Sequence, residues 1–172
     1  MALVRFLAGL LLAATLHFAG VRIVDWFPRA FDLFLLAAVI EGRRGQPTGA
    51  MLAGLAAGLA TDGVTGGPYG LFGFADTLVA WGVAVAARQL VVQRTTSLAA
   101  LFAAAAAAQQ AIVAGLALVF RPGADLVSPE WLLARVGTTA LVGLVWIRVA
   151  EWVLGRFASR RSRRQTKLGS PR

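Results

Sequence analysis

The chain of 172 residues contains no cysteine and one histidine, and only 15% of its residues are charged. Without cysteine, disulfides and thiolate metal sites are excluded. The single histidine, His17, argues against a histidine-based metal site and against a Ser-His-Asp triad. The sequence also lacks an HExxH motif and a glycine-rich phosphate loop with a lysine. We therefore expect a protein that is not an enzyme and that binds no cofactor and no metal.

Apolar residues dominate the sequence instead. Hydrophobic residues make up 58% of the chain and the mean hydropathy is +0.72, whereas about 25% of the residues of a soluble domain are charged. A spanning helix needs roughly 20 apolar residues, with a range of about 17 to 25. The composition predicts an all-α, polytopic integral membrane protein with about six transmembrane helices. The apolar segments are Leu3–Val24, Pro28–Ile40, Thr48–Thr61, Tyr69–Ala87, Ser97–Phe120 and Pro129–Leu154.

The first three apolar segments leave alternatives open. The second and third are short, so they either cross the membrane fully or form a re-entrant hairpin. A hairpin would bury Arg43 and Arg44 at a cost of roughly 2.5–3.5 kcal/mol each, which favours two crossings. The first segment has the pattern of a cleaved signal peptide, because Arg5 precedes an apolar run. Its length of about 22 residues favours a retained span.

The net charge of +9 is concentrated near the C-terminus. We expect residues 1–156 to form the transmembrane helical domain and residues 157–172 to form a basic, disordered cytoplasmic tail. Such a tail is typical of contact with anionic lipids, so we expect membrane lipids and no nucleic acid as partners. The positive-inside rule places both termini in the cytoplasm. The basic residues of that side are then Arg5, Arg43, Arg44, Arg88, Arg94 and those of the tail.

Small residues recur at every fourth position of the third segment. Ala50, Gly54 and Gly58 share one helix face, and the acidic residue Asp62 ends this stripe. In a membrane, such a face lets another helix approach closely. We predict that the stripe packs against a helix, either of this chain or of a partner. The structural residues of the turn that follows are Gly66, Gly67, Pro68 and Gly70.

Four polar residues, His17, Asp32, Asp76 and Arg135, lie within the apolar segments, where ionisable groups are costly and are candidates for function. Asp32 either caps the N-terminus of the second segment or has a functional role. Asp76 and Arg135 lie in the same half of the membrane, which suggests an ion pair between them. Asp62 is either solvated in the external turn or part of the packing face. We expect His17 to be a polar residue of a helix contact.

Two glutamines, Gln109 and Gln110, follow a run of alanines in the fifth segment. They lie near the middle of the predicted membrane span. Amide side chains at that depth most often form hydrogen bonds to a neighbouring helix. Binding of a ligand is the alternative role.

Several short motifs follow one another between residues 28 and 74. Pro28 and Phe31-Asp32-Leu33 precede the glycine- and arginine-rich turn 41–45, and the next helix ends in Gly58-Leu59-Ala60-Thr61-Asp62. The turn Gly67-Pro68-Tyr69-Gly70-Leu71 then opens another helix. This order resembles the MreD family of bacterial rod shape-determining membrane proteins. The chain departs from the family at Phe31, because the family usually has proline directly before the first aspartate.

The resemblance implies a non-enzymatic scaffold of the cell-elongation complex. Such a scaffold binds an MreC-like partner and supports side-wall peptidoglycan synthesis by a RodA-type glycosyltransferase and its transpeptidase. The implied location is the bacterial inner membrane. The family's fold is similar to the substrate-binding subunits of energy-coupling-factor vitamin transporters, so a small-molecule binding subunit is the alternative function. A vitamin-binding subunit should show a polar and aromatic pocket lined by external loops.

Overall fold

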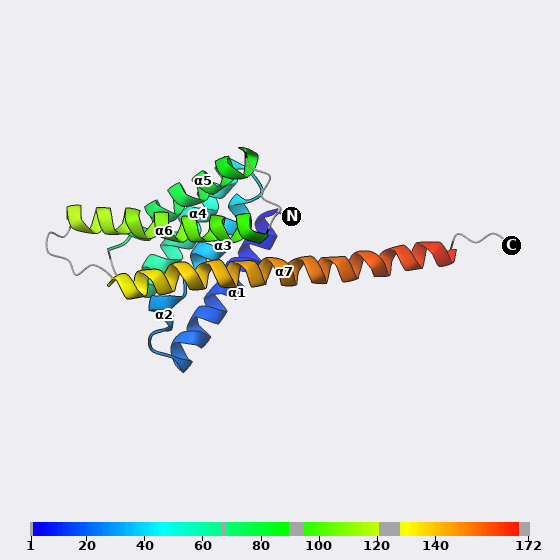
Figure 1. Ribbon diagram of the computed structural model, residues 1–172, viewed down its shortest axis with the longest axis horizontal. Helices are drawn as coiled ribbons and strands as arrows, with labels where there is room; N and C mark the ends of the chain where they lie inside the picture. The colour runs from blue at the N-terminus through cyan, green and yellow to red at the C-terminus, as the bar shows by residue number, and fades with distance from the viewer. Residues whose placement is uncertain (1, 67, 90–94, 121–127, 169–172) are drawn as a thin grey trace.

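The computed structural model describes residues 2–66, 68–89, 95–120 and 128–168. No strand occurs among these residues, so the predicted all-α fold class is confirmed. Figure 1 shows a bundle of helices crossed obliquely by the first helix, with the last helix running along the bundle and far beyond it. The helices are α1 (Ala2–Ile23), α2 (Phe27–Ala30), α3 (Leu33–Gly42), α4 (Pro47–Thr65), α5 (Leu71–Gln89), α6 (Thr95–Phe120) and α7 (Pro129–Leu168).

Four of the described helices are long and apolar enough to cross a membrane, which supports the predicted membrane location. Helix α3 has ten residues, so it is about 15 Å long, half the thickness of a hydrocarbon core of roughly 30 Å. Helix α4 has 19 residues but is rich in glycine and alanine. Six crossings therefore remain a prediction. The four candidate spans are Leu3–Ile23, Leu71–Gln89, Thr96–Phe120 and Pro129–Val149.

Helix α4 packs against α3 and, most extensively, against α5. Pro47 opens α4 in its first turn, where a missing N–H has no cost. Gly66 ends the helix with a φ of 66°, and its N–H donates to the carbonyl oxygen of Asp62 at 3.2 Å. Because the connection to α5 is short, α4 and α5 form an antiparallel helical hairpin.

Two apolar clusters form the core. The first joins α3, α5, α6 and α7 around Phe102, which is fully buried. The second joins α1, α3, α4 and α5, and many of its side chains are alanines, including Ala38, Ala57 and Ala80. Small side chains let the helices of the second cluster approach closely. The core therefore brings the polar residues of four different helices near one another.

Two elements differ from the sequence-based expectation. The predicted second segment is interrupted at Phe31 and Asp32, so it forms the short α2 and then α3. Helix α7 continues to Leu168, whereas the sequence predicts a disordered tail from residue 157. Arginine, lysine and glutamine are good helix formers, which favours continuation of the helix beyond the apolar segment. Residues 169–172 of the predicted tail lie outside the described residues.

Candidate functional site: a buried polar cluster

Asp32 stands at the break between α2 and α3 and is 4% exposed. Its backbone is not helical, and its Oδ1 accepts a hydrogen bond from the N–H of Leu35 at 2.9 Å. This is the geometry of a side chain that caps a helix N-terminus, where a negative charge is also favoured by the helix dipole. Capping is one of the two roles that the sequence indicates for Asp32. The cap uses only Oδ1, so Oδ2 is left for other partners.

The other oxygen of Asp32 faces α6 and α7. Oδ2 accepts a hydrogen bond from Nε2 of Gln109 at 2.8 Å and forms an ion pair with Nη2 of Arg135. The guanidinium carbon of Arg135 lies 5.5 Å from the ring centroid of Phe72, within cation–π range. The prediction of an ion pair between Asp76 and Arg135 is therefore wrong, because Arg135 pairs with Asp32.

Gln109 connects the two buried aspartates. Its Nε2 donates to Oδ2 of Asp32 and also to Oδ1 of Asp76 at 2.7 Å, so both amide hydrogens are used. Its Oε1 accepts a hydrogen bond from Nε2 of Gln110 at 3.0 Å. Gln109 and Asp76 are fully buried. The predicted hydrogen bonding of a glutamine to neighbouring helices thus occurs at Gln109, while Gln110 supports it from within α6.

Thr138 adds a further connection between α7 and the end of α2. Its hydroxyl donates to the carbonyl oxygen of Ala30 and is also 3.1 Å from the carbonyl oxygen of Arg135. The sequence analysis missed this residue. Its position three residues after Arg135, on the same helix face, is the signal that could have indicated it.

The polar cluster, defined here as Asp32, Asp76, Gln109, Gln110 and Arg135, holds two carboxylates and one guanidinium. Oδ2 of Asp76 and Nε of Arg135 have no hydrogen-bond partner among the described residues. Buried polar groups are costly unless they are paired. The described residues hold no group of three side chains suited to a metal ion. Its geometry serves to join α3, α5, α6 and α7.

Asp62 forms a second cap, at the other end of α4. It is 1% exposed, and its Oδ2 accepts hydrogen bonds from the N–H groups of Gly70 at 2.9 Å and Gly73 at 3.1 Å. Its Oδ1 accepts another from the N–H of Phe72 at 3.0 Å. These are the groups that a helix N-terminus leaves without an internal partner. Asp62 is therefore not solvated in the external turn, because it caps α5.

The turn after Asp62 places these donors. Gly70 has a φ of 98°, a conformation that favours glycine. Gly66 has the left-handed geometry described above, and Pro68 is exposed beside the turn. Gly67, another residue that the sequence assigns to the turn, lies outside the described residues.

The stripe of small residues packs against α5 of the same chain. A Cβ on Gly54 would lie 2.9 Å from Cβ of Ala80 and closer still to the backbone of Asp76. A Cβ on Gly58 would lie 2.6 Å from Cα of Gly73. Ala50, the first residue of the stripe, is also buried. Of the two alternatives that the sequence leaves open, the structure shows the contact within the chain, and this face is not available to a partner.

His17 lies on α1 among aromatic rings rather than in the polar cluster. Its ring centroid is 5.4 Å from that of Phe34 and 6.2 Å from that of Phe27. Its Nδ1 has no hydrogen-bond partner among the described residues. His17 therefore lies in a contact of α1 with α2 and α3.

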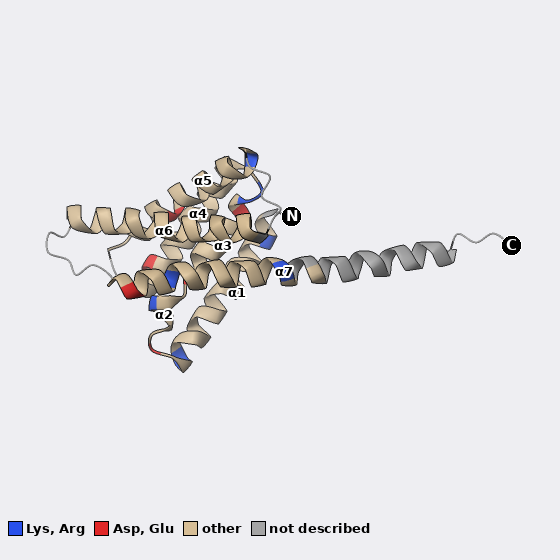
Figure 2. Ribbon diagram, in the orientation of Figure 1, with Lys and Arg blue, Asp and Glu red and all other residues tan. Residues whose placement is uncertain are grey.

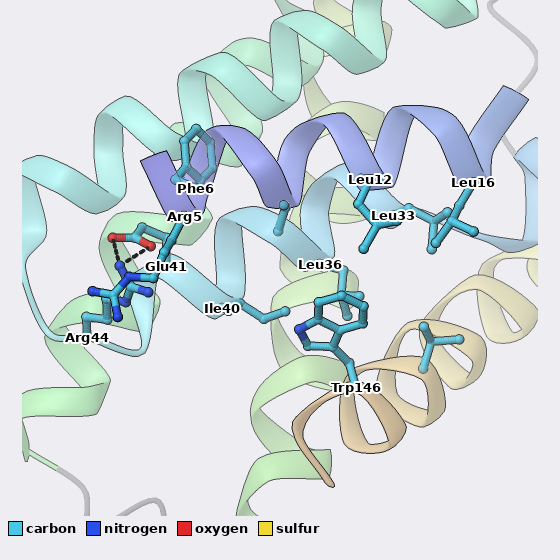
Figure 3. Close-up of a pocket in the computed structure, with 14 residues that line it drawn as sticks. Arg5, Phe6, Leu12, Leu16, Leu33, Leu36, Ile40, Glu41, Arg44 and Trp146 are labelled. Atoms are coloured by element: carbon cyan, nitrogen blue, oxygen red, sulfur yellow. Dashed lines mark hydrogen bonds and ion pairs between the residues drawn. The ribbon is translucent and has the colours of Figure 1, made fainter. Parts of the chain in front are cut away.

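The described residues line several hollows on the surface around this core, of which three bear on function. One of 220 Å³ lies between α1, α3 and α7, and Figure 3 shows the residues that line it. Another, of 280 Å³, lies between α5 and α6. A third, of 810 Å³, lies beside the α4–α5 turn and the end of α6.

Comparisons of the chain with protein-family models, with curated proteins and with solved structures find no match.

Proposed function

We propose that the protein is a non-enzymatic membrane scaffold of the bacterial cell-elongation complex. It holds the transmembrane helix of an MreC-like partner and thereby supports side-wall peptidoglycan synthesis by a RodA-type glycosyltransferase and its transpeptidase. The resemblance of residues 28–74 to the MreD family supports this proposal. The two aspartates of those motifs, Asp32 and Asp62, cap α3 and α5. The motif residues thus fix the starts of α3 and α5, and α5 forms one wall of the groove between α5 and α6.

The observation that carries the proposal is the groove between α5 and α6. Small residues line it, including Gly82 and Ala86 of α5 and Ala104 and Ala108 of α6. A Cβ on Gly82 would meet nothing within 4 Å, in contrast to Gly54, whose space is already filled by α5. Small side chains beside open space let a helix of another protein approach closely. The stripe within α4 packs inside this chain, whereas the α5–α6 groove is open to a partner.

The proposed location is the bacterial inner membrane, with both termini in the cytoplasm. Arg5, Arg44 and Arg88 gather at the end of the bundle where α1 begins and where α3 and α5 end (Figure 2). The positive-inside rule assigns this end to the cytoplasm. A cysteine at position 44 should therefore resist a membrane-impermeant thiol reagent in intact cells. Labelling of this cysteine from outside would contradict the orientation.

A substitution in the groove tests the partner surface. Gly82→Leu places a large side chain in open space and replaces glycine by a better helix former, so the chain should still fold. It should weaken recovery of a co-expressed MreC-like protein by roughly 5- to 150-fold, since overpacking a close contact costs about 1–3 kcal/mol. Gly115→Leu is the matched control, because Gly115 of α6 is equally open and lies in none of the three hollows. Equal recovery of the MreC-like protein with Gly82→Leu and with Gly115→Leu would contradict the proposal that the partner binds at the α5–α6 groove.

The alternative function, a small-molecule binding subunit of a vitamin transporter, is favoured by one observation. The hollow beside the α4–α5 turn measures 810 Å³, within the range of about 300–1,000 Å³ for ligand sites. The aromatic residues Tyr69, Phe74 and Phe120 line it. No charged side chain is among its described lining residues, so groups that would orient a polar vitamin are few. Mass spectrometry of the purified protein distinguishes the two functions, because a binding subunit retains a stoichiometric small ligand without any partner.

A further inference from the structure

The groove between α1, α3 and α7 is apolar along most of its length. Figure 3 shows Leu12, Leu16 and Leu33 toward one end and Trp146 beside Leu36 near the middle. Gly9 of α1 also lines the groove, and a Cβ at Gly9 would meet nothing within 4 Å. A side chain placed there would therefore occupy the groove without disturbing the bundle.

The opposite end of the groove is charged. Arg5 of α1 lies there with Glu41 of α3 and Arg44, as Figure 3 shows. Nη1 of Arg44 and Oε2 of Glu41 form an ion pair at 2.8 Å. The Arg44 side chain is 33% exposed in this pair and that of Glu41 is 14% exposed. Arg5 forms no hydrogen bond or ion pair with the described residues, so this end has an excess of one positive charge.

The dimensions of the groove restrict what it can hold. Its lining on α1 runs from Arg5 to Leu16, which corresponds to about 16 Å along a helix. Its volume is 220 Å³, and apolar side chains line most of it. A long apolar groove with basic residues at one end matches the shape and charge of one extended acyl chain below an anionic headgroup.

We propose that this groove binds one acyl chain of an anionic phospholipid, with the phosphate of the lipid at Arg5 and Arg44. Two of the three helices that line the groove, α1 and α7, are long and apolar enough to cross a membrane, and the charged end of the groove lies where the chain's basic residues gather. Basic residues beside an apolar slot select an anionic headgroup, because surrounding lipids compete equally for the acyl contacts. This site goes beyond the scaffold function and does not depend on it.

Native mass spectrometry tests the site on the full chain in detergent. The protein is titrated with equal amounts of phosphatidylglycerol and phosphatidylcholine that carry identical acyl chains. The first lipid bound should be phosphatidylglycerol, with a preference of roughly fivefold or more, the factor that about 1 kcal/mol per basic residue gives. Arg5→Gln should reduce this preference about fivefold. Arg22→Gln, the same change at the other end of α1, should leave it unchanged.

Two further variants separate binding at the groove from general effects of charge and folding. Glu41→Gln removes the negative charge beside Arg44, so it should strengthen binding of phosphatidylglycerol. If the Glu41–Arg44 ion pair only stabilised the fold, the same change would not strengthen binding of this lipid. Gly9→Leu should fill the groove and abolish the selective binding, and Gly115→Leu should not. Equal binding of the two lipids by the wild-type chain would overturn the proposal. So would a Gly9→Leu variant that keeps its lipid selectivity but no longer recovers an MreC-like protein, since the groove would then belong to the partner.

Discussion

Replacing Gly58 by alanine adds one methyl group at the closest approach of α4 and α5. The new Cβ would lie 2.6 Å from Cα of Gly73 and nearer still to the carbonyl group of Phe72. These neighbours are backbone atoms, so no side-chain rotation can relieve the contact. Non-bonded carbons rest about 3.5–4.0 Å apart, so the two helices must separate by about 0.9 Å or more.

The separation also affects the cap at Asp62. Phe72 and Gly73 are two of the three residues whose N–H groups donate to the Asp62 carboxylate. Overpacking costs about 1–3 kcal/mol, a lost hydrogen bond to a charged group costs roughly 1.5–3 kcal/mol, and alanine returns about 1 kcal/mol in helix propensity. The expected loss in the free energy of unfolding is therefore about 1.5–5 kcal/mol.

Reversible unfolding in mixed micelles of mild detergent and dodecyl sulfate, followed by circular dichroism, measures this loss. Gly82→Ala is the matched control, because a Cβ at Gly82 meets nothing within 4 Å. It should be as stable as the wild type or more stable by up to about 1 kcal/mol. If Gly58→Ala and Gly82→Ala unfold at the same dodecyl sulfate fraction, the described packing of α4 on α5 is refuted.

Two further predictions concern the buried carboxylates. Asp62→Asn keeps the size of the side chain but leaves it only one accepting oxygen, so it should destabilise the chain by about 1.5–3 kcal/mol in the same assay. The control is Asp25→Asn, which should not destabilise the chain because Asp25 is exposed. Equal stability of the two variants would argue against the cap that Asp62 forms on α5. Arg135→Gln leaves Asp32 without its ion partner and should cost about 3–5 kcal/mol. A second change, Asp32→Asn, should recover more of this loss than Asp76→Asn does, and the reverse ranking would favour a pair between Asp76 and Arg135.

The error at Asp76 shows what hydropathy and depth can and cannot predict. Position along an apolar segment gives the expected depth of a residue in the membrane, which puts Asp76 and Arg135 in the same half, and both residues lie in the polar cluster. Which acid Arg135 meets depends on the rotation of α7 about its own axis and on the order of helices around the bundle. Neither follows from one sequence. The position of Gln109 between Asp32 and Asp76 also depends on helix rotation and helix order, so its bridging hydrogen bonds could not be predicted from the sequence.

Asp62 illustrates a second limit. The sequence places it near the C-terminus of α4, where the dipole of its own helix disfavours a negative charge. The glycine-rich turn folds the chain back so that the first N–H groups of α5 point at the carboxylate. The four-residue spacing of the stripe was sufficient to predict a close helix contact. The identity of the neighbouring helix came only from the short turn and the backbone positions of α5.

The lengths of α3 and α4 limit the prediction of topology in another way. Hydrophobic content marks both as apolar, yet α3 is about half of a membrane thickness because Phe31 and Asp32 interrupt the helix before it. A residue that caps one helix necessarily ends the regular structure that precedes it. The sequence indicated capping at Asp32 without indicating that the preceding helix would be only four residues long.

The most direct test of the scaffold function is purification of the chain from native bacterial membranes, with identification of every protein and small molecule that accompanies it in a fixed ratio. The scaffold function predicts an MreC-like protein at constant stoichiometry and no bound vitamin-like compound. A stoichiometric small ligand in the absence of any MreC-like protein would contradict it and would favour the transporter subunit.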